Sequence, residues 1–264
     1  NFLHPVLSLF PLILFENLDF VFHWEDLLNA VLGFLLFLGV IILSITIVRK
    51  HLKYEFWYLT HLFVYLAIIL SWGHQLKWGE DLQIPFATMY WYFLFLFVFG
   101  NLILFRFLKP WAIFLKHRFY IENIVKETPE VTSFYITGKN MDSFHVSPGQ
   151  FMIFRFLSKK FWWQAHPFSL SRPTDGKSIR ISVKNSGDFT SELPTVQKGT
   201  QVYIDGGHGI FTKKFATKNK ILFIAGGIGV TPIRSLIEDM AKEGKDIIFL
   251  YSNKTKSEIA FPQE

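Results

Sequence analysis

The stretch LQIPFATMYWYFLFLFVFGNLILF (residues 82–105) contains no charged side chain over 24 residues. A helix needs about 20 apolar residues to cross a hydrocarbon core of about 30 Å, because each residue adds about 1.5 Å. Residues 27–48, with 22 residues, and 56–74, with 19, also lack Asp, Glu, Lys and Arg. We therefore predict three membrane-spanning helices in the first 108 residues.

The composition argues against a wholly soluble globular protein. Of the 264 residues 50% are hydrophobic and 18% aromatic, and the mean hydropathy is +0.28. The formal charge of +6 is uneven, because residues 1–108 sum to −2 and residues 109–264 to +8. We expect the basic second part to face anionic cofactors and an anionic membrane leaflet, with no nucleic acid as a partner.

The chain contains no cysteine. Within these residues this excludes disulfides, thiolate metal sites, iron-sulfur clusters and covalently attached c-type haem. Redox or metal chemistry would then depend on histidine or on a bound organic cofactor.

The links between the predicted spans alternate in charge. The links after the first and third full spans are basic, and the other two are mostly acidic. Because basic links face the cytoplasm, everything after residue 108 is predicted to be cytoplasmic in a plasma-membrane protein. The basic residues of these two links are Arg49, Lys50, Lys53, Arg106, Lys109, Lys116 and Arg118.

Residues 1–15 look like the second half of a further span, so we expect earlier helices to be missing.

Ionisable side chains inside a span usually mark a function. His61 and His74 are 13 residues apart, or about 20 Å along a helix, which suits two stacked haems. His4 would lie at the depth of His74 and bind the same iron. On an ideal helix the two imidazoles differ by roughly 140° in azimuth. A distortion near Gly73, or haems approached from different sides, would be needed.

The alternative interpretation makes His61 an interfacial polar anchor and places His74 in the headgroup region. The remaining histidines considered are predicted to be solvated, and they are His23, His51, His117 and His145.

The pattern changes to alternation from about residue 119. Runs such as VTSFYIT (131–137) and SIRISVK (178–184), separated by turns, predict a small antiparallel β-barrel. From residue 220 the pattern becomes a strand, a Gly-rich turn, a helix from about 232 to 242, and a second strand, as in nucleotide-binding domains. The predicted fold is a multi-domain membrane protein with an all-α transmembrane bundle (1–108), a linker (109–117), an antiparallel β-barrel (118–215) and an α/β domain cut short at its end (216–264).

The turn GGIGVTP (226–232) combines glycines with the start of a helix. Glycine permits close backbone approach to a phosphate, and the helix N-terminus favours a pyrophosphate. Thr231 is predicted to cap the helix and Pro232 to take its first position. Turns of this kind also occur for packing alone. The second strand ends without an acid, at Ser252 and near Lys254, which favours NADPH over NADH.

Two further motifs precede this turn. HPFSLS (166–171) ends an aromatic run, and KNSGDFTSEL (184–193) reads as a loop entering a helix. In the second motif, the hydroxyls of Thr190 and Ser191 are candidates to donate to an anion.

Together these residues resemble the ferric reductase and NADPH oxidase superfamily, which joins a haem-bearing helical bundle to a flavin and nicotinamide module. HPFSLS is similar to the family's flavin-binding HPF[ST] motif, GDFT to its pyrophosphate loop and GGIGVTP to its nicotinamide-cofactor loop. GGHGIF (206–211) resembles GPYGxF, with His208 in place of the aromatic. The spacing of His61 and His74 matches the family's second pair of haem ligands.

The resemblance implies FAD, two b-type haems and NADPH as cofactors. It implies that His166 and Thr190 approach the flavin phosphates, that Phe168 packs near the ring, and that Ser169 lies close to its reactive edge. The implied FAD residues are His166, Pro167, Phe168, Ser169, Lys184, Gly187, Asp188, Phe189 and Thr190; the implied NADPH residues are Gly226, Gly227, Ile228, Gly229, Thr231, Pro232, Ser252 and Lys254; the implied haem ligands are His61, His74 and His4.

The implied activity is an electron relay across the membrane. NADPH reduces FAD on the cytoplasmic side, and electrons pass through the inner and outer haems to oxygen, giving superoxide, or to ferric iron outside. The family's hydride-transfer segment lies beyond residue 264, so no catalytic residue is named.

Two other functions compete with the relay. In one, the chain is a membrane-anchored flavin reductase without haem that serves a protein or a quinone. In the other, it is a non-enzymatic haem-binding or scaffold protein with a degenerate reductase half. The intact HPFS, GDFT and GGIGVTP motifs argue against the second.

Overall fold

The computed structural model describes residues 27–45, 50–52 and 54–262, which fall into two compact units, residues 1–100 and 101–264. His4, the stretch 1–15, and the basic residues Arg49 and Lys53 lie outside the described residues, as does His23. The two units are described in turn.

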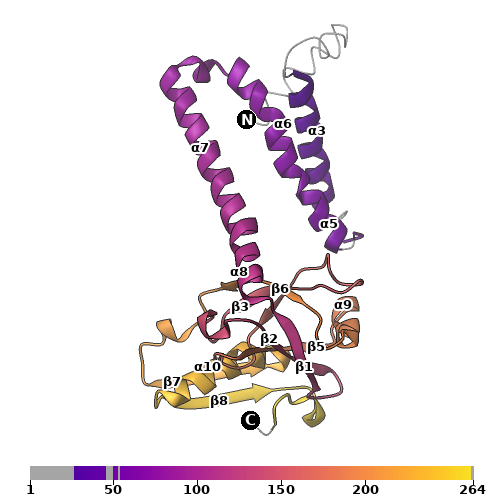
Figure 1. Ribbon diagram of the computed structural model, residues 1–264, viewed down its shortest axis with the longest axis vertical. Helices are drawn as coiled ribbons and strands as arrows, with labels where there is room; N and C mark the ends of the chain where they lie inside the picture. The colour runs from indigo at the N-terminus through magenta and orange to yellow at the C-terminus, as the bar shows by residue number, and fades with distance from the viewer. Residues whose placement is uncertain (1–26, 46–49, 53, 263–264) are drawn as a thin grey trace. The chain divides into compact units, whose positions relative to one another are not determined.

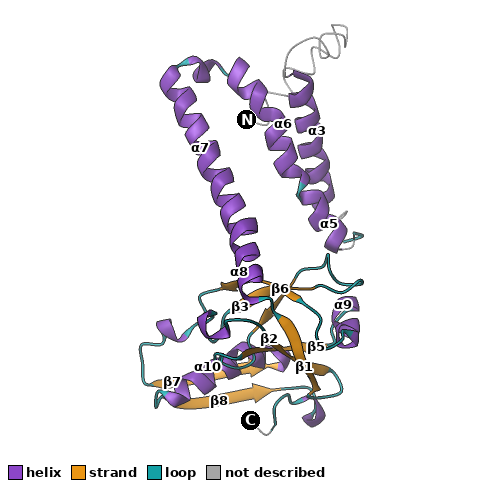
Figure 2. Ribbon diagram, viewed as in Figure 1, coloured by secondary structure: helices purple, strands orange, loops and turns teal. Residues whose placement is uncertain are grey.

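The first unit is helical in its described part (Figures 1 and 2). Within the described residues, three helical stretches are long and apolar enough to cross a membrane: Leu27–Ser44, Phe56–Lys77 and Pro85–His117. This agrees with the three predicted spans in number, by length and composition. The elements are α3 (Leu27–Ser44), α5 (Tyr54–His61), α6 (Phe63–Trp78), the 3₁₀ turn η1 (Glu80–Gln83) and α7 (Pro85–Ile103).

Helices α3 and α6 pack closely because small residues meet between them. Gly33 is buried on α3, and a Cβ added there would lie 2.5 Å from the Ser71 Oγ and 2.8 Å from the Ala67 carbonyl oxygen of α6. Ala67 and Ser71 are four residues apart, so they lie on one face of α6. Small residues at such positions let membrane helices approach backbone to backbone.

The second span is interrupted one residue past His61. Helix α5 ends at His61 and α6 begins at Phe63, and the backbone N–H of Leu62 bonds to the Leu59 carbonyl three residues back, at 3.1 Å. Helix α6 continues without a break through Gly73. The distortion considered near Gly73 is therefore found at Leu62, so the ideal-helix azimuth between His61 and His74 does not apply.

The third helix extends beyond the predicted span. After α7 a π-helical turn, η2 (Leu104–Leu108), leads directly into α8 (Lys109–His117), so the predicted linker 109–117 is helical. Pro110 has no N–H to donate within the helix. The widened turn before it, in which the Lys109 N–H bonds to the Leu104 carbonyl five residues back, lets the helix continue.

The second unit contains two three-stranded antiparallel sheets, ordered β1-β2-β5 and β4-β3-β6. Single bridges join them, between Tyr120 and Gln201 and between Leu170 and Ile181. The antiparallel strands agree with the prediction, but the described residues form two sheets and no closed barrel, because alternation fixes strands and not how their edges meet. The strands are β1 (Tyr120–Lys126), β2 (Val131–Thr137), β3 (Phe151–Phe156), β4 (His166–Ser169), β5 (Ser178–Lys184) and β6 (Val202–His208).

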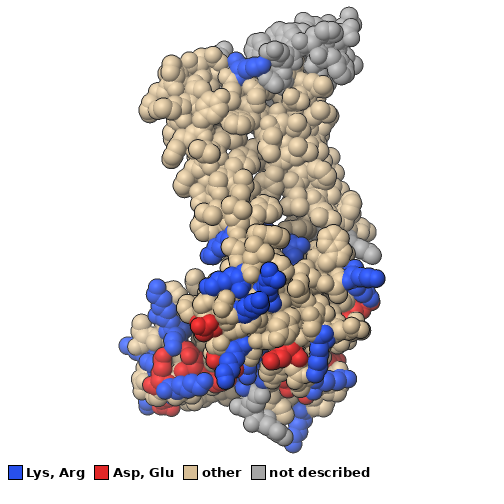
Figure 3. All heavy atoms as spheres, in the orientation of Figure 1, with Lys and Arg blue, Asp and Glu red and all other residues tan. Residues whose placement is uncertain are grey.

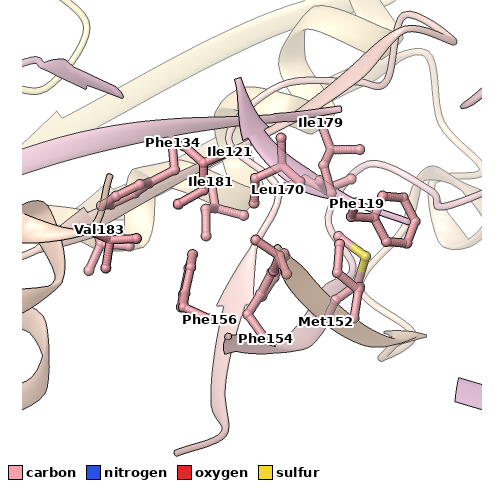
Figure 4. Packing of buried hydrophobic residues seen from close by; sticks show 14 of the residues in the cluster. Phe119, Ile121, Phe134, Met152, Phe154, Phe156, Leu170, Ile179, Ile181 and Val183 are labelled. Atoms are coloured by element: carbon pink, nitrogen blue, oxygen red, sulfur yellow. The ribbon is translucent and has the colours of Figure 1, made fainter. Parts of the chain in front are cut away.

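The core of this unit lies between the two sheets. Figure 4 shows side chains of β1, β2 and β5 pointing toward those of β3. Burying each such side chain stabilises the fold by about 1.5–3 kcal/mol. The fully buried members include Ile121, Phe134, Ile136, Met152, Phe154, Phe156, Ile179 and Ile181, all 0% exposed.

The last part is a parallel strand-helix-strand unit. Strands β7 (Lys220–Gly226) and β8 (Asp246–Ser252) pair in parallel, and α10 (Val230–Lys242) connects them. Phe223 and Leu236 belong to one buried cluster between the sheet and α10. The remaining short elements are η3 (Met141–Ser143), α9 (Asp188–Glu192), η4 (Leu193–Thr195), η5 (Lys213–Phe215), η6 (Gly227–Gly229) and η7 (Lys256–Glu258).

Replacing Gly33 by alanine should separate α3 from α6, because the new methyl group overlaps backbone and side-chain atoms of α6. We expect a loss of about 1–3 kcal/mol in the free energy of unfolding, as for other overpacked sites. Thermal unfolding in detergent, followed by circular dichroism, measures it. Gly39→Ala on the same helix is the matched control, since nothing lies within 4 Å of its added Cβ. Equal melting temperatures for the two variants would contradict the close packing.

Candidate functional site

Strand β4 and helix α9 bring the HPF and GDF motifs together. The ring of His166 stacks on that of Phe189 with centroids 3.6 Å apart and planes 18° from parallel. Phe168 lies 6.4 Å from Phe189 and packs against the core between the sheets. The two motifs, separated by about 20 residues in the sequence, therefore meet on the side chain of Phe189.

Ser169 lies on the opposite face of β4 from Phe168, because successive residues of a strand point to opposite faces. Its register partner is Phe151 of β3, and Phe151 is in turn paired with His208 of β6. The rings of Phe151 and His208 have centroids 5.7 Å apart. Ser169 and His208, from two of the predicted motifs, thus flank Phe151 on the outward face, about 10 Å apart across three strands.

The hydroxyl groups of the GDFT loop are used within the loop. The Thr190 hydroxyl accepts from the Ser186 N–H at 2.9 Å and donates to the Gly187 carbonyl at 3.1 Å. The Ser191 hydroxyl donates to the Asp188 carbonyl at 2.8 Å. Both hydroxyl groups that were predicted to donate to an anion therefore donate to backbone carbonyls of the turn that begins α9.

Lys184 lies at the end of β5, where two carboxylates bind its ammonium group. Its Nζ is 3.0 Å from an oxygen of Glu130 and 3.2 Å from one of Glu258. Hydrogen bonding to Glu130, and then to Glu258, raises the pKa of the Lys184 ammonium. The residue implied for FAD therefore ties β5 to the segment after β8.

The glycines of the GGIG turn have room around them. A Cβ added at Gly226, Gly227 or Gly229 would have no heavy atom within 4 Å. Gly227 has φ +52°, which favours glycine, whereas Gly226 (φ −123°) and Gly229 (φ −59°) have dihedral angles that any residue adopts. Neither packing nor backbone conformation requires glycine at 226 or 229. The open side of the turn fits a pyrophosphate, which approaches the backbone closely.

The predicted cap of α10 is wrong. The helix begins at Val230 after Gly229, and no side chain caps it. The Thr231 hydroxyl donates backward to the Ile228 carbonyl at 3.1 Å, and Pro232 is the third helical residue. The η6 turn already supplies a helical approach, so Thr231 enters the first turn and becomes buried.

The parallel register places Ser252, at the end of β8, beside the GGIG turn at the end of β7. Gly226 at the end of β7 is paired with Ser252 at the end of β8, and Lys254 follows as an exposed residue. The carboxyl ends of parallel strands next to a helix N-terminus are where such folds bind nucleotides. The structure therefore brings together the GGIG turn, Ser252 and the neighbourhood of Lys254, as predicted from the strand-helix-strand pattern.

Two arginines that sequence reasoning missed join the sheets to α10. The Ser171 carbonyl accepts from Arg180 at 3.1 Å and from Arg234 at 2.7 Å. Both guanidinium groups lie over the ring of Phe261, at 4.7 Å and 5.3 Å from its centroid. Arg180 is only 2% exposed. Arg180 alternates with isoleucines in SIRISVK, on the same face as Ser178, Ser182 and Lys184, so the pattern gave no signal of its burial; a buried arginine must be paired.

The turn before β3 is also fixed against α10. The Gly149 N–H donates to the Ser235 Oγ at 2.9 Å. Gly149 has φ +86°, and a Cβ there would overlap the Phe211 carbonyl oxygen. Glycine is therefore required at this position, in contrast to positions 226 and 229.

In the helical unit, His61 has a defined environment. Its Nδ1 lies 2.7 Å from the Trp57 carbonyl oxygen and its Nε2 lies 2.8 Å from the Ser44 Oγ. A carbonyl only accepts, so Nδ1 carries the proton and Nε2 has the lone pair. The Ser44 hydroxyl has a second acceptor, the Val40 carbonyl, at 2.6 Å. His74 is half-buried on α6.

The prediction that His117 is solvated is wrong. The side chain is buried, its Nδ1 lies 2.9 Å from the Lys139 carbonyl, and its ring stacks on Phe119 with centroids 5.2 Å apart. The helical extension α8 places it against the β unit, which a linker would not have done. His51 and His145 are exposed, as predicted.

Comparison with known proteins identifies one part of the chain. Residues 121–223 match the family model of an FAD-binding domain. A flavohemoprotein of Candida albicans is 31% identical over 160 residues, which are 58% of this chain and 40% of that protein. A protein of Pyrococcus furiosus, named a probable dihydroorotate dehydrogenase B (NAD(+)) electron transfer subunit, is 36% identical over 151 residues, 53% of this chain and 51% of that protein.

A solved structure shows a similar fold. The flavohemoglobin of Malassezia yamatoensis, with bound FAD and heme, superposes with a TM-score of 0.50 at 17% identity and covers 75% of this chain and 54% of that one. The chain spans about half or less of the length of the curated relatives reported above. The matches show that residues 121–223 are similar to an FAD-binding domain, a module that the flavohemoprotein of Candida albicans shares.

Alanine at Gly226 or Gly229 should leave the free energy of unfolding within about 0.5 kcal/mol of the parent, because each fits the backbone and touches nothing. We expect binding of NADPH to weaken at least about tenfold, or about 1.4 kcal/mol, since the methyl group fills the space of the pyrophosphate. Calorimetric titration and thermal unfolding measure the two effects.

Gly149→Ala is the contrasting variant, because its added Cβ meets the Phe211 carbonyl. It should lower the melting temperature clearly. Unchanged affinity for NADPH in the Gly226 and Gly229 variants would show that these glycines serve no ligand.

Proposed function

We propose that this protein transfers electrons from NADPH through FAD and two b-type haems across a membrane to an acceptor on the other side. The observation that carries the proposal is the joining, in one chain, of an FAD-binding domain to three helices long and apolar enough to span a bilayer. A flavin module alone would not need those helices. A histidine within one of them offers an iron ligand.

His61 fits the role of a haem ligand. Metal-binding histidines usually donate their second ring N–H to a carbonyl, which fixes the tautomer. The Nδ1 contact to the Trp57 carbonyl does this and leaves the Nε2 lone pair for iron. The Ser44 hydroxyl, now 2.8 Å from Nε2, retains the Val40 carbonyl as its acceptor when it turns away. When iron takes the Nε2 lone pair, the Ser44 hydroxyl can still donate to the Val40 carbonyl, so neither side chain is left without a partner.

His74, on α6, is proposed as the ligand of the outer haem, with His4 as its partner. His4 lies outside the described residues, so the support for this pair is the spacing and the apolar setting of His74. Haem held by histidine without cysteine is of the b type. The protein's part in the relay is to hold the irons and tune their potentials.

The flavin side of the relay is proposed to use the outward face of β4, β3 and β6. Bound FAD accepts two electrons as a hydride and releases them singly. Ser169 and His208, on either side of Phe151, are the polar residues placed for its ring system. Gly187, with no atom within 4 Å of an added Cβ, leaves space for the pyrophosphate.

NADPH is proposed to bind at the open GGIG turn, with its second half toward Ser252. Lys254 is exposed there, and the strand ends without the acid that would bind the ribose hydroxyls of NADH. The basic links favour the cytoplasmic side of the plasma membrane for this module. Oxygen is the proposed acceptor, because the link after α6 is short and oxygen needs only access to a haem edge; ferric iron is the alternative.

One observation favours a second function, a membrane-anchored flavin reductase that serves a protein or a quinone without haem. Both ring nitrogens of His61 contact protein groups, as they would in a purely structural anchor between α3 and α5. The optical spectrum of the full-length protein separates the two functions.

The purified full-length protein should show a Soret band that shifts when NADPH is added. His61→Ala and His74→Ala should each lose part of the band, because each removes one axial ligand. His145→Ala is the matched control, since His145 is exposed in the β unit. A flavin spectrum without any Soret band would establish the haem-free reductase instead.

The acceptor is tested by supplying NADPH in air and measuring cytochrome c reduction. With oxygen as acceptor, superoxide dismutase should abolish most of this reduction. Ferric chelates should be reduced more slowly under anaerobic conditions than oxygen is in air. A much higher anaerobic rate with ferric iron would reverse the assignment.

A further inference from the structure

Helix α8 has one face packed on its own domain. Pro110 and His117 are buried, Ile113 packs against the core between the sheets, and Phe114 lies 5.6 Å from the ring of Tyr203 on β6. These contacts fix the azimuth of α8. They decide which of its residues face away from the domain.

The other face of α8 is exposed and divided lengthwise. Trp111 is 55% and Leu115 49% exposed, and their spacing of four residues puts them on one line of the helix. Lys109 and Lys116, also exposed, are seven residues apart and form a second line. Ala112 lies exposed between the two lines. Tryptophan and lysine side chains of this kind are enriched where a membrane-crossing helix passes through the interface.

The helix that carries this face has only basic charged residues. Between residues 101 and 121 the sequence has no Asp or Glu. Arg106 lies 3.6 Å from Asp205 of β6, but in the part of the chain that the structure describes Lys109, Lys116 and Arg118 form no ion pair. Figure 3 shows basic side chains gathered at this end of the domain. The charge of the face therefore complements an anionic partner.

The length of the helix sets where this face would lie. The uncharged part, residues 85–105, spans about 32 Å, which matches a hydrocarbon core of about 30 Å. Lys109 and Trp111 follow Arg106 by about 5 Å and 8 Å along the axis. The headgroup region is about 5–8 Å deep on each side. Lys109 and Trp111 thus fall at the depth of the headgroups.

We propose that Lys109 and Trp111 on the exposed face of α8 enter the anionic headgroup layer of the membrane, that Lys116, about 15 Å beyond Arg106, is attracted to this layer from within a Debye length, and that α8 in this way anchors the flavin domain to the bilayer. The inference rests on the proposed membrane span. Tryptophan and lysine are the side chains that membrane interfaces favour, the one for its amphipathic ring and the other for anionic lipid.

A spin label at Ala112→Cys tests the anchor, and residues 1–264 contain no cysteine that would compete with it. The protein is reconstituted into vesicles of phosphatidylcholine alone or with phosphatidylglycerol. In the anionic vesicles we expect the label to become several-fold more accessible to oxygen relative to a water-soluble nickel complex. Salt at about 1 M, where the Debye length falls to about 3 Å, should remove most of the difference between the two lipids.

Two further labels separate the inference from the proposed function. A label at Leu96→Cys reports the span, because Leu96 lies in α7 and is 76% exposed. A label at Lys242→Cys on α10 reports a surface expected to stay in water. Deep burial of the Leu96 label with an aqueous Ala112 label would overturn the anchor and leave the span intact. Aqueous labels at both positions would overturn the span and the anchor together.

Charge removal provides the matched comparison. The triple change Lys109→Gln, Lys116→Gln and Arg118→Gln should abolish the effect of phosphatidylglycerol on the Ala112 label. A control triple change of exposed lysines elsewhere in the domain should leave the effect unchanged; its positions are Lys177, Lys220 and Lys242.

Three results would count against a lipid anchor. Equal responses of the two triple variants would overturn it, because the charge of α8 would then play no special part. Suppression of the lipid effect by millimolar inorganic phosphate at constant ionic strength would indicate a site for free phosphate. Dipolar broadening between Ala112 labels on separate chains would show that a second copy covers this face.

Discussion

Strand β3 is the constraint on which the rest of the flavin domain depends. It pairs with β4 on one edge and β6 on the other, and its inward side chains Met152, Phe154 and Phe156 fill the core. Because those positions are committed inward, Phe151 faces outward together with Ser169, and a register shift between Phe151 and Met152 brings His208 opposite Phe151 on β6. A slip of one residue would reverse both faces at once. The outward row of Ser169, Phe151 and His208 is thus a by-product of how the core is packed.

The same sheet also meets the helix that leads from the apolar unit. Tyr203 and Asp205 of β6, five and three residues before His208 in the strand, contact Phe114 and Arg106 respectively. The proposed flavin face and the attachment of α8 therefore share one strand. A substitution that shifts α8 would therefore displace β6, and through β6 the proposed flavin face.

Much of this could be predicted from the sequence, because the signals were periodic or local. Uncharged runs indicated the apolar helices, alternation indicated the strands, and the strand-turn-helix order indicated the GGIG site. What failed depended on contacts between distant segments. Alternation did not show that the strands form two sheets, and nothing near Pro110 indicated a π turn that keeps the helix going. The burial of His117 and the pairing of Arg180 followed from those tertiary contacts.

Single residues were misread where two local preferences competed. Threonine often caps helices, but the 3₁₀ turn before Thr231 already forms the approach to α10. The Thr231 hydroxyl therefore donates to the Ile228 carbonyl, three residues earlier. The hydroxyls of Thr190 and Ser191 likewise satisfy the backbone of their own turn. Short polar side chains readily form hydrogen bonds with nearby backbone groups. A motif read from sequence alone therefore overestimates how many of their hydrogen bonds are available to a ligand.

The turn at Gly149 has a consequence for rate as well as for stability. It brings α10 directly against the approach to β3 through the hydrogen bond from the Gly149 N–H to the Ser235 Oγ. With FAD and NADPH bound as proposed, this contact would help to hold their two faces together, so that part of the entropy of bringing the reactants together is lost during folding and not at each turnover. High effective molarity depends on such fixed placement. Gly149, which is not proposed to contact either cofactor, would in this way affect how often the two cofactors are correctly aligned.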